Sequence, residues 1–143
     1  MDIKDLIPQR EPFLFIDKFD QQSEDKMITS YFFQEDLNFF QGHFPGEPIV
    51  PGVILSEHCF QSAAALMGLR SNKTESPEKG LTVLSRIQSA KFKNLVLPNT
   101  RIETETILIE QIDNAAFFKS IVKNEDNKKV LIIEYACTLI KKI

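Results

Sequence analysis

The stretch from Gly52 to Leu69 constrains the fold more than any other part of this 143-residue chain. It contains no proline, it is apolar almost all round a helical surface, and its one formal charge is Glu57. At 1.5 Å per residue such a helix is about 27 Å long, and a helix that is apolar on every side must be buried. The sequence therefore predicts one long central helix that the rest of the chain encloses.

A constrained loop leads into this helix. Three prolines lie between Gly42 and Gly52, and each removes a backbone donor and fixes φ. Proline is favoured at the first position of a helix, so Pro51 marks the helix start. The first N–H groups of a helix have no partner within it, and those of Gly52 and Val53 could therefore hold a carbonyl oxygen.

Two titratable side chains lie in and beside the helix. His43 is in the loop, and Glu57 is the charge within the apolar stretch. Histidine titrates near neutral pH, and burial raises the pKa of a carboxyl group towards it, so the pair could act as base and acid. The structural alternative is that Glu57 caps a strand or pairs with a basic group, and that His43 only shapes the loop. From the residues alone, we expect an acid, a base and an oxyanion site around this loop.

The loop and helix share a dense motif, His-Phe-Pro-Gly-x-Pro-x-x-Pro-Gly-Val, followed by Glu and Gln. Its positions are His43, Phe44, Pro45, Gly46, Pro48, Pro51, Gly52, Val53, Glu57 and Gln61. The motif resembles the active-site signature of the 3-hydroxyacyl-[acyl-carrier-protein] dehydratases of fatty-acid synthesis, which are hotdog-fold enzymes. Leu6–Asp17, Ala90–Lys93 and Val96–Pro98 are similar to other segments of that family, so the resemblance covers most of the chain.

The resemblance implies dehydration of a 3-hydroxyacyl thioester to the trans-2-enoyl thioester, without a metal or redox cofactor. It implies His43 and Glu57 as the catalytic residues. Residues expected to bind the thioester oxygen or the substrate are Gly52, Val53, Phe44 and Gln61. Either Glu57 protonates the leaving hydroxyl, directly or through water, or His43 performs both proton transfers.

Two positions depart from the family pattern, Gln9 in place of His and Asn99 in place of Gly. These departures leave acyl chain length and pathway open, so a dehydratase of aryl-polyene or other polyketide-like chains is an alternative. A hotdog acyl thioesterase and a non-catalytic acyl-binding protein are further alternatives. The family members that also isomerise the double bond carry Asp at the position of Glu57, so the resemblance favours dehydration alone.

Patterning outside the motif predicts the same architecture. Asp2–Ile7 reads as a short helix, residues 21–25 as a turn, and residues 70–80 as a loop. The predicted strands are Phe13–Phe19, Lys26–Gln34, Leu81–Phe92, Arg101–Ile112, Ala115–Lys123 and Lys129–Ile140. Short turns between consecutive strands make an antiparallel sheet, so we expect one α+β domain over residues 1–143, with about six strands wrapped around the helix.

Composition excludes several classes of protein. A net charge of −3 argues against general nucleic-acid binding. No uninterrupted apolar run reaches the roughly 18 residues of a membrane span, and no signal peptide is apparent, which predicts a cytoplasmic protein. Cys59 and Cys137 lie in apolar runs and are expected to be buried thiols. With only His43 and His58 as histidines, a metal site has little support.

The implied partner is an acidic acyl carrier protein, so the site entrance should be basic. Lys91 and Lys93 alternate with Phe92, which puts both on one face of a strand. Arg86 and Arg70 are further candidates for this surface. The alternative is an ordinary solvated face.

Sheet edges and an incompletely covered helix favour pairing with a second copy. The resemblance implies a homodimer in which His43 of one subunit faces Glu57 of the other, with larger assemblies left open. His58 follows Glu57 by a step of about 100° on the helix, so we expect it on another face and its removal to be mild. An aromatic cluster could form core or the wall of an acyl tunnel: Tyr31, Phe32, Phe33, Phe39, Phe40 and Phe44.

Overall fold

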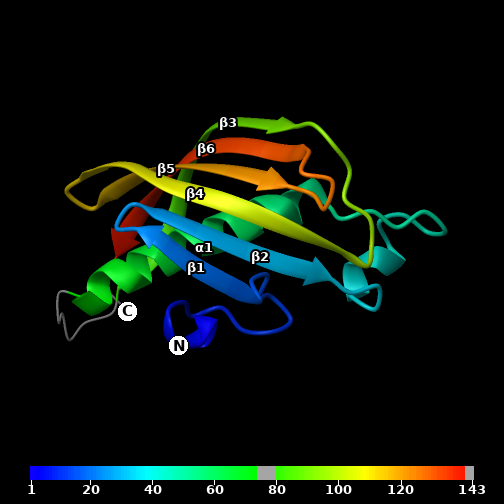
Figure 1. The fold of residues 1–143 in the computed structure, drawn as a ribbon, viewed down its shortest axis with the longest axis horizontal. Helices are drawn as coiled ribbons and strands as arrows, with labels where there is room; N and C mark the ends of the chain where they lie inside the picture. Colours follow the sequence, from blue (N-terminus) through cyan, green and yellow to red (C-terminus); the bar gives the residue numbers. More distant parts are fainter. Residues whose placement is uncertain (74–79, 141–143) are drawn as a thin grey trace.

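The computed structural model describes residues 1–73 and 80–140. In this part of the chain, six strands form an antiparallel sheet that curves around one long helix, α1 (Gly52–Lys73) (Figure 1). The strands are β1 (Lys18–Ser23), β2 (Lys26–Phe33), β3 (Leu81–Phe92), β4 (Thr100–Ile112), β5 (Ala115–Lys123) and β6 (Lys129–Ile140). Two 3-10 helices, η1 (Ile3–Asp5) and η2 (Asn38–Gln41), precede α1.

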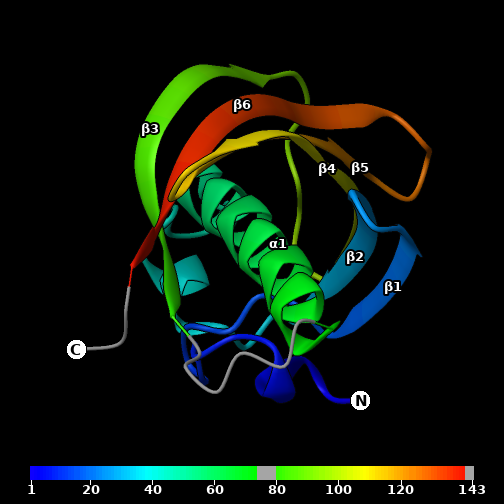
Figure 2. The ribbon, with the colours of Figure 1, turned by 90° about the vertical axis from the view of Figure 1, so that its left-hand side faces the viewer.

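The strand order across the sheet is β1-β2-β4-β5-β6-β3. Figure 2 shows α1 running obliquely across the concave side of the curved sheet. The predicted α+β arrangement is therefore confirmed, with β3, β5 and β6 at their predicted bounds. Side chains in β5 alternate strictly between buried and partly exposed, as expected for a strand with one face on the core.

The helix is buried over most of its length, but its buried surface is mixed in character. Cys59, Ala63, Ala65 and Leu66 are fully buried, as the apolar pattern predicts. Four polar side chains are buried with them: Ser56, His58, Gln61 and Ser62. The description of α1 as apolar on all sides is thus not confirmed. No helix within the described ranges is long and apolar enough to cross a membrane.

Polar bonds from several strands hold α1 against the sheet. The Thr29 hydroxyl of β2 is 2.7 Å from the Ser62 hydroxyl. Tyr135 of β6 donates its hydroxyl to the Cys59 carbonyl at 2.9 Å. Buried polar groups are costly unless they are hydrogen-bonded, and these pairs satisfy one another. They also fix the position of α1 along its axis relative to the strands of the sheet.

The first strand lies later in the chain than predicted. The predicted strand over residues 13–19 and turn over residues 21–25 were wrong, because β1 covers Lys18–Ser23 and only residues 24–25 form the turn. Leu14, Phe15 and Ile16 are all buried in succession, which no half-exposed strand allows. Their segment packs on α1, where helix side chains bind its backbone.

The helix also ends later than expected. The predicted helix stops at Leu69, whereas α1 continues to Lys73, so the first residues of the predicted loop are helical. The rest of that predicted loop, residues 74–79, lies outside the described residues.

Candidate active site

The loop before α1 is closed by backbone hydrogen bonds. Phe44 and Glu47 exchange bonds of 3.1 and 2.9 Å, and the Ile49 N–H donates to the His43 carbonyl at 2.9 Å. Gly46 adopts a φ of +78°, a conformation that side chains disfavour. The Val50 N–H donates to the Val96 carbonyl at 2.8 Å, which joins the loop to the segment after β3.

His43 is half-buried in this loop, and its tautomer follows from its partner. Its Nδ1 lies 3.1 Å from the carbonyl oxygen of Ile49. A carbonyl oxygen only accepts hydrogen bonds, so Nδ1 carries the proton of the neutral ring and Nε2 keeps its lone pair. The Phe44 ring stacks on the imidazole with 4.1 Å between ring centroids. The loop thus presents an oriented imidazole with a basic nitrogen.

The start of α1 combines free backbone donors with a close ring contact. Among the described residues, none accepts a hydrogen bond from the N–H of Gly52 or Val53. The Phe92 ring lies so close to Gly52 that an added Cβ would be 3.0 Å from its Cε1 atom. Only glycine admits this approach without movement of the ring. These N–H groups have the geometry of an anion-binding helix terminus.

Glu57 lies further along α1 and is bound by Gln61. The Gln61 Nε2 donates to Glu57 Oε2 at 3.0 Å. Burial raises the pKa of Glu57, while the hydrogen bond from Gln61 acts in the opposite direction. The carboxyl group therefore has the raised pKa expected of a general acid.

Gln61 is fully buried, and both the oxygen and the nitrogen of its side-chain amide form hydrogen bonds within the chain. Its Oε1 accepts the Phe15 N–H at 2.8 Å, and its Nε2 donates to the Phe13 carbonyl at 3.0 Å as well as to Glu57. The sequence identified Gln61 as a substrate-binding candidate. In the structure its polar contacts are with Glu57 and the segment that precedes β1.

His58 is the polar residue whose importance the sequence reading underestimated. It is fully buried, with Nδ1 at 2.6 Å from the Phe15 carbonyl and Nε2 at 2.8 Å from the Thr104 hydroxyl. Burial lowers its pKa to about 4, against the opposing effects of the Phe15 bond and the Asp17 charge. Because both ring nitrogens have buried partners, the structure leads us to expect a costly removal, in place of the mild effect predicted from the helical position alone. The missed signal was a polar side chain on a helix predicted to be buried, which must have partners.

Within one chain, the two predicted catalytic residues do not meet. No hydrogen bond or ion pair joins His43 to Glu57, although both lie in the described part of the chain. Cys137 of β6 is a neighbour of Glu57 that the sequence did not reveal. Burial, and then the Glu57 charge, raise the pKa of the Cys137 thiol to about 12. Cys137 and Cys59 are free and buried, as predicted.

The predicted basic residues divide between the two ends of the molecule. Lys91 and Lys93 are exposed, and because side chains alternate along a strand they point away from the face on which Phe92 contacts Gly52 at the start of α1. Arg86 is exposed further along β3. Arg70 is near the opposite end of α1, where it pairs with Asp25 at 2.7 Å. Arg70 therefore does not belong to the predicted carrier surface.

The aromatic residues form a chain of contacts that continues into the segment before β1. Tyr31, Phe33, Phe39 and Phe40 contact one another as predicted, and Phe15 joins them through an edge-on contact with Tyr31 at 5.8 Å. Phe13 extends the chain from Phe15. Phe44 and Phe32 lie apart, the first on His43 and the second under the Arg101 guanidinium. Phe33 and Phe40 are buried, so part of the cluster is core.

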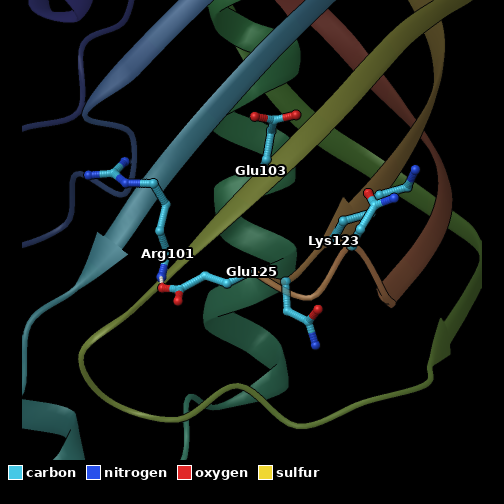
Figure 3. A pocket seen from close by; sticks show the side chains of 6 residues that line it. Arg101, Glu103, Lys123 and Glu125 are labelled. Atoms are coloured by element: carbon cyan, nitrogen blue, oxygen red, sulfur yellow. Dashed lines mark hydrogen bonds between the residues drawn. The ribbon is translucent and has the colours of Figure 1, made fainter.

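A pocket on the outer side of the sheet is separate from this site. It encloses about 270 Å³ and includes Arg101, Glu103, Lys123 and Glu125 (Figure 3). The Glu125 carboxylate accepts the Arg101 backbone N–H at 2.7 Å. The charges of its two basic and two acidic side chains cancel. Figure 3 shows the sheet between these side chains and α1. None of the predicted site residues lines it.

The two departures from the family pattern have different structural settings. Asn99 has a φ of +61°, the left-handed conformation that glycine, and among other residues asparagine, adopts most readily. Its side chain also bonds Glu35, at 3.2 Å to the N–H and 3.0 Å to the carboxylate. Gln9 is half-buried and its Oε1 has no partner in the described structure. Asn99 thus adopts the conformation that glycine would supply at this position.

Comparisons with known proteins agree with this picture. The ApeI-like family model, described as ApeI dehydratase, matches residues 20–131. The 3-hydroxyacyl-[acyl-carrier-protein] dehydratase FabZ of Lactobacillus helveticus is 36% identical over 126 residues, covering 87% of this chain and 82% of the relative. The enzyme of the same name from Anaeromyxobacter sp. (strain K) is 33% identical over 138 residues, covering 96% and 87%.

One solved structure is similar over almost the whole chain. It is the dehydratase heterocomplex ApeI:P from Xenorhabdus doucetiae, with a TM-score of 0.83 over 99% of this chain and 93% of that one. At 14% sequence identity this likeness establishes the fold. The hotdog fold predicted from the sequence is confirmed.

Proposed function

The chain belongs to the family of FabZ- and ApeI-like hotdog dehydratases, and on this basis we propose that it dehydrates 3-hydroxyacyl thioesters carried by acyl carrier protein. The product is the trans-2-enoyl thioester. The relatives named as 3-hydroxyacyl-[acyl-carrier-protein] dehydratases support the substrate class. The observation that carries the proposal is the orientation of His43, whose Nδ1 is occupied by the Ile49 carbonyl.

In the proposed reaction His43 is the base. Its Nε2 takes a proton from C2 of the substrate, which the thioester carbonyl makes acidic. The electron pair left at C2 is delocalised onto the carbonyl oxygen. The Gly52 N–H at the start of α1 donates to this oxygen as its negative charge develops, with Val53 beside it. The exposed Phe44 ring stacks on His43, and the Phe92 ring lies against Gly52.

Glu57 is the proposed acid. The electron pair returns to form the C2–C3 double bond, the C3–O bond breaks, and the Glu57 proton joins the leaving hydroxide as water. The imidazolium then returns its proton to the carboxylate, directly or through water. The raised pKa of Glu57 supports this role. If His43 performs both transfers, Glu57 holds the leaving group or a water instead.

We further propose that the site is completed by a second copy of the chain. The two edges of the sheet differ: β1 has 6 residues and is mainly polar, whereas β3 has 12 residues and exposes Val83, Leu84 and Ile87. A long apolar edge favours pairing with another strand. A homodimer through β3 would cover this edge, and the absence of a bond between His43 and Glu57 within one chain supports a shared site. Lys91 and Lys93 remain the proposed carrier-binding residues.

An aryl-polyene or related polyketide-like substrate is the second candidate. One structural feature favours it, and the match to the ApeI-like family model is compatible with it. Gln61, which binds Glu57, also binds the Phe13 carbonyl, so the aromatic chain from Phe13 to Phe39 begins beside the proposed acid. Edge-on aromatic side chains suit a planar, unsaturated acyl chain.

Turnover of defined carrier-bound substrates tests both candidates. The purified protein is given 3-hydroxyacyl carriers with saturated chains or with aryl-polyene chains, and intact-carrier mass spectrometry detects the loss of one water. Faster reaction of saturated chains supports fatty-acid synthesis, and faster reaction of aryl-polyene chains supports the second candidate. Release of free carrier thiol without dehydration would instead identify a thioesterase.

A further inference from the structure

A continuous line of hydrogen bonds runs from β4 to the proposed acid. The Thr104 hydroxyl is 2.8 Å from His58 Nε2, and His58 Nδ1 is 2.6 Å from the Phe15 carbonyl. The Phe15 N–H donates to Gln61 Oε1 at 2.8 Å, and Gln61 Nε2 donates to Glu57 Oε2 at 3.0 Å. Thr104, His58 and Gln61 are fully buried, and Phe15 is almost so. Water therefore has no access to the bonds among Thr104, His58, Phe15 and Gln61, whereas the last bond, to the half-buried Glu57, is only partly buried.

The chemistry of the partners fixes the direction of every bond in this line. The Phe15 carbonyl can only accept, so His58 carries its proton on Nδ1 and accepts the Thr104 hydroxyl at Nε2. The Phe15 N–H can only donate, so the oxygen of the Gln61 amide must face it. The amide nitrogen is then directed at Glu57, and it can only donate.

This direction has a consequence for the carboxyl group. An amide N–H is accepted best by a carbonyl or ionised oxygen, so Glu57 Oε2 is the accepting oxygen and an acidic proton resides on Oε1. Oε1 has no hydrogen-bond partner among the described residues, so it is available to a substrate. We propose that His58 is a positioning residue that acts through Phe15 and Gln61 to keep the acidic proton of Glu57 on Oε1. This inference rests on the proposed function of Glu57.

Phe15 depends on side chains of α1 for both of its backbone hydrogen bonds. On either side of Phe15 the segment is held by backbone bonds, from the Phe13 N–H to the Arg10 carbonyl at 2.8 Å and from the Asp17 N–H to the Ser30 carbonyl of β2 at 3.0 Å.

Without the His58 bond, only Gln61 bonds the backbone of Phe15 itself. With Phe15 held less firmly, a half-turn of the Gln61 amide costs less, although it also breaks the bond to the Phe13 carbonyl; such a turn would present oxygen to Glu57 and remove its donor.

Two substitutions of His58 separate positioning from simple packing. An asparagine amide reaches about as far as Nδ1, so His58→Asn keeps a donor for the Phe15 carbonyl and loses the Thr104 bond. A glutamine amide reaches about as far as Nε2, so His58→Gln keeps the Thr104 bond and loses the Phe15 donor. We expect kcat of His58→Gln to fall at least about tenfold with KM little changed, and His58→Asn to stay within about threefold of wild type.

Thr29→Val is the matched control. It removes a buried bond between α1 and the sheet, the 2.7 Å contact with Ser62, and leaves the line to Glu57 intact. It should lower stability with kcat unchanged. If His58→Gln does not fold, His58→Leu replaces it, because an apolar side chain of similar volume also lacks the Phe15 donor.

Two readouts are independent of turnover. Carbon NMR of the Glu57 carboxyl measures its pKa, and hydrogen exchange measures the protection of the Phe15 amide. Because donation from Gln61 lowers the pKa of Glu57, its loss in His58→Gln should raise that pKa and speed exchange at Phe15. Cys137, the titratable neighbour on β6, has a pKa of about 12 and stays uncharged in this range. In His58→Asn neither readout should move.

The results distinguish this inference from the proposed function. If the protein has no dehydratase activity, the proposed function is refuted. The positioning role of His58 is still supported if His58→Gln changes both the pKa of Glu57 and the rate of hydrogen exchange at Phe15. Unchanged Glu57 pKa and Phe15 exchange in His58→Gln would overturn the positioning role, whatever the activity. The positioning role would also be overturned if His58→Gln and His58→Asn lost kcat equally and in proportion to the fall in their melting temperatures.

Discussion

His43 Nδ1 lies 3.1 Å from the Ile49 carbonyl, so the nitrogen that keeps its lone pair in the neutral ring is Nε2. If this nitrogen is the base and Glu57 the acid, His43→Ala and Glu57→Gln should each lower kcat by about 10²–10⁴-fold with folding preserved. Hydration of an enoyl thioester, the reverse reaction, measures the loss. Glu47→Gln changes an exposed carboxylate of the same loop and should have no effect. A near wild-type rate in either variant would remove that residue from the mechanism.

The contact between Gly52 and Phe92 predicts a specific pair of substitutions. Gly52→Ala puts a methyl group 3.0 Å from the Phe92 ring, so either the ring or the start of α1 must shift, at a cost of about 1–3 kcal/mol. We expect kcat to fall because the N–H donors move, and Phe92→Leu in the same protein to restore part of it. Gly42→Ala is the control, because nothing lies within 4 Å of that Cβ. Full activity of Gly52→Ala would argue against an oxyanion site there.

His58 should make the protein sensitive to acid. Its pKa is lowered from 6.5 in the unfolded chain to about 4 when folded, so between these values the unfolded chain binds the proton more strongly. Folding stability contributed by the neutral ring is present above pH 6.5 and is lost as pH falls towards 4, by about 3 kcal/mol in total. Urea unfolding at several pH values measures this loss.

His58→Asn isolates that effect, because asparagine does not titrate. Glu57 opposes the trend in wild type, since its raised pKa favours the folded state on protonation, but it is present in both proteins. The difference in unfolding free energy between wild type and His58→Asn should therefore shrink as pH falls. A difference that stays constant with pH would show that His58 titrates normally.

Mixing inactive subunits tests the shared site. His43→Ala and Glu57→Ala proteins, each inactive alone, are mixed under conditions that exchange subunits. In a mixed dimer one site carries both substitutions and the other neither, so random pairing should restore about a quarter of wild-type sites. Mass spectrometry confirms the exchange. Mixed dimers without activity would put both residues of a site in one chain.

The carrier surface predicts a difference between substrates. Lys91→Glu and Lys93→Glu, alone and together, should lower kcat/KM for a carrier-bound substrate far more than for a small thioester, with a strong dependence on salt. Lys18→Glu, on the opposite edge strand β1, is the control for a general charge effect. Equal losses on both substrates would exclude these lysines from carrier binding.

Much of this protein was predictable because local patterns settle local structure. The prolines before Gly52 and the apolar stretch after it predict a loop followed by a buried helix, and the turns predict consecutive antiparallel strands. The dense motif around His43 and Glu57 predicted the family, which the comparisons confirm. The catalytic roles of these two residues stay predictions.

Only the tertiary structure decided the surroundings of Glu57. The run Leu14–Ile16 resembles a strand locally, yet it packs on α1 because Gln61 and His58, more than forty residues away, bind its backbone. For the same reason His58, adjacent to Glu57 in sequence, could not be recognised as the link between β4 and Phe15. Sequence patterns report which face a side chain takes on its own element. Hydrogen bonds between elements that are distant in sequence depend on how those elements pack against one another, and only the tertiary structure shows that arrangement.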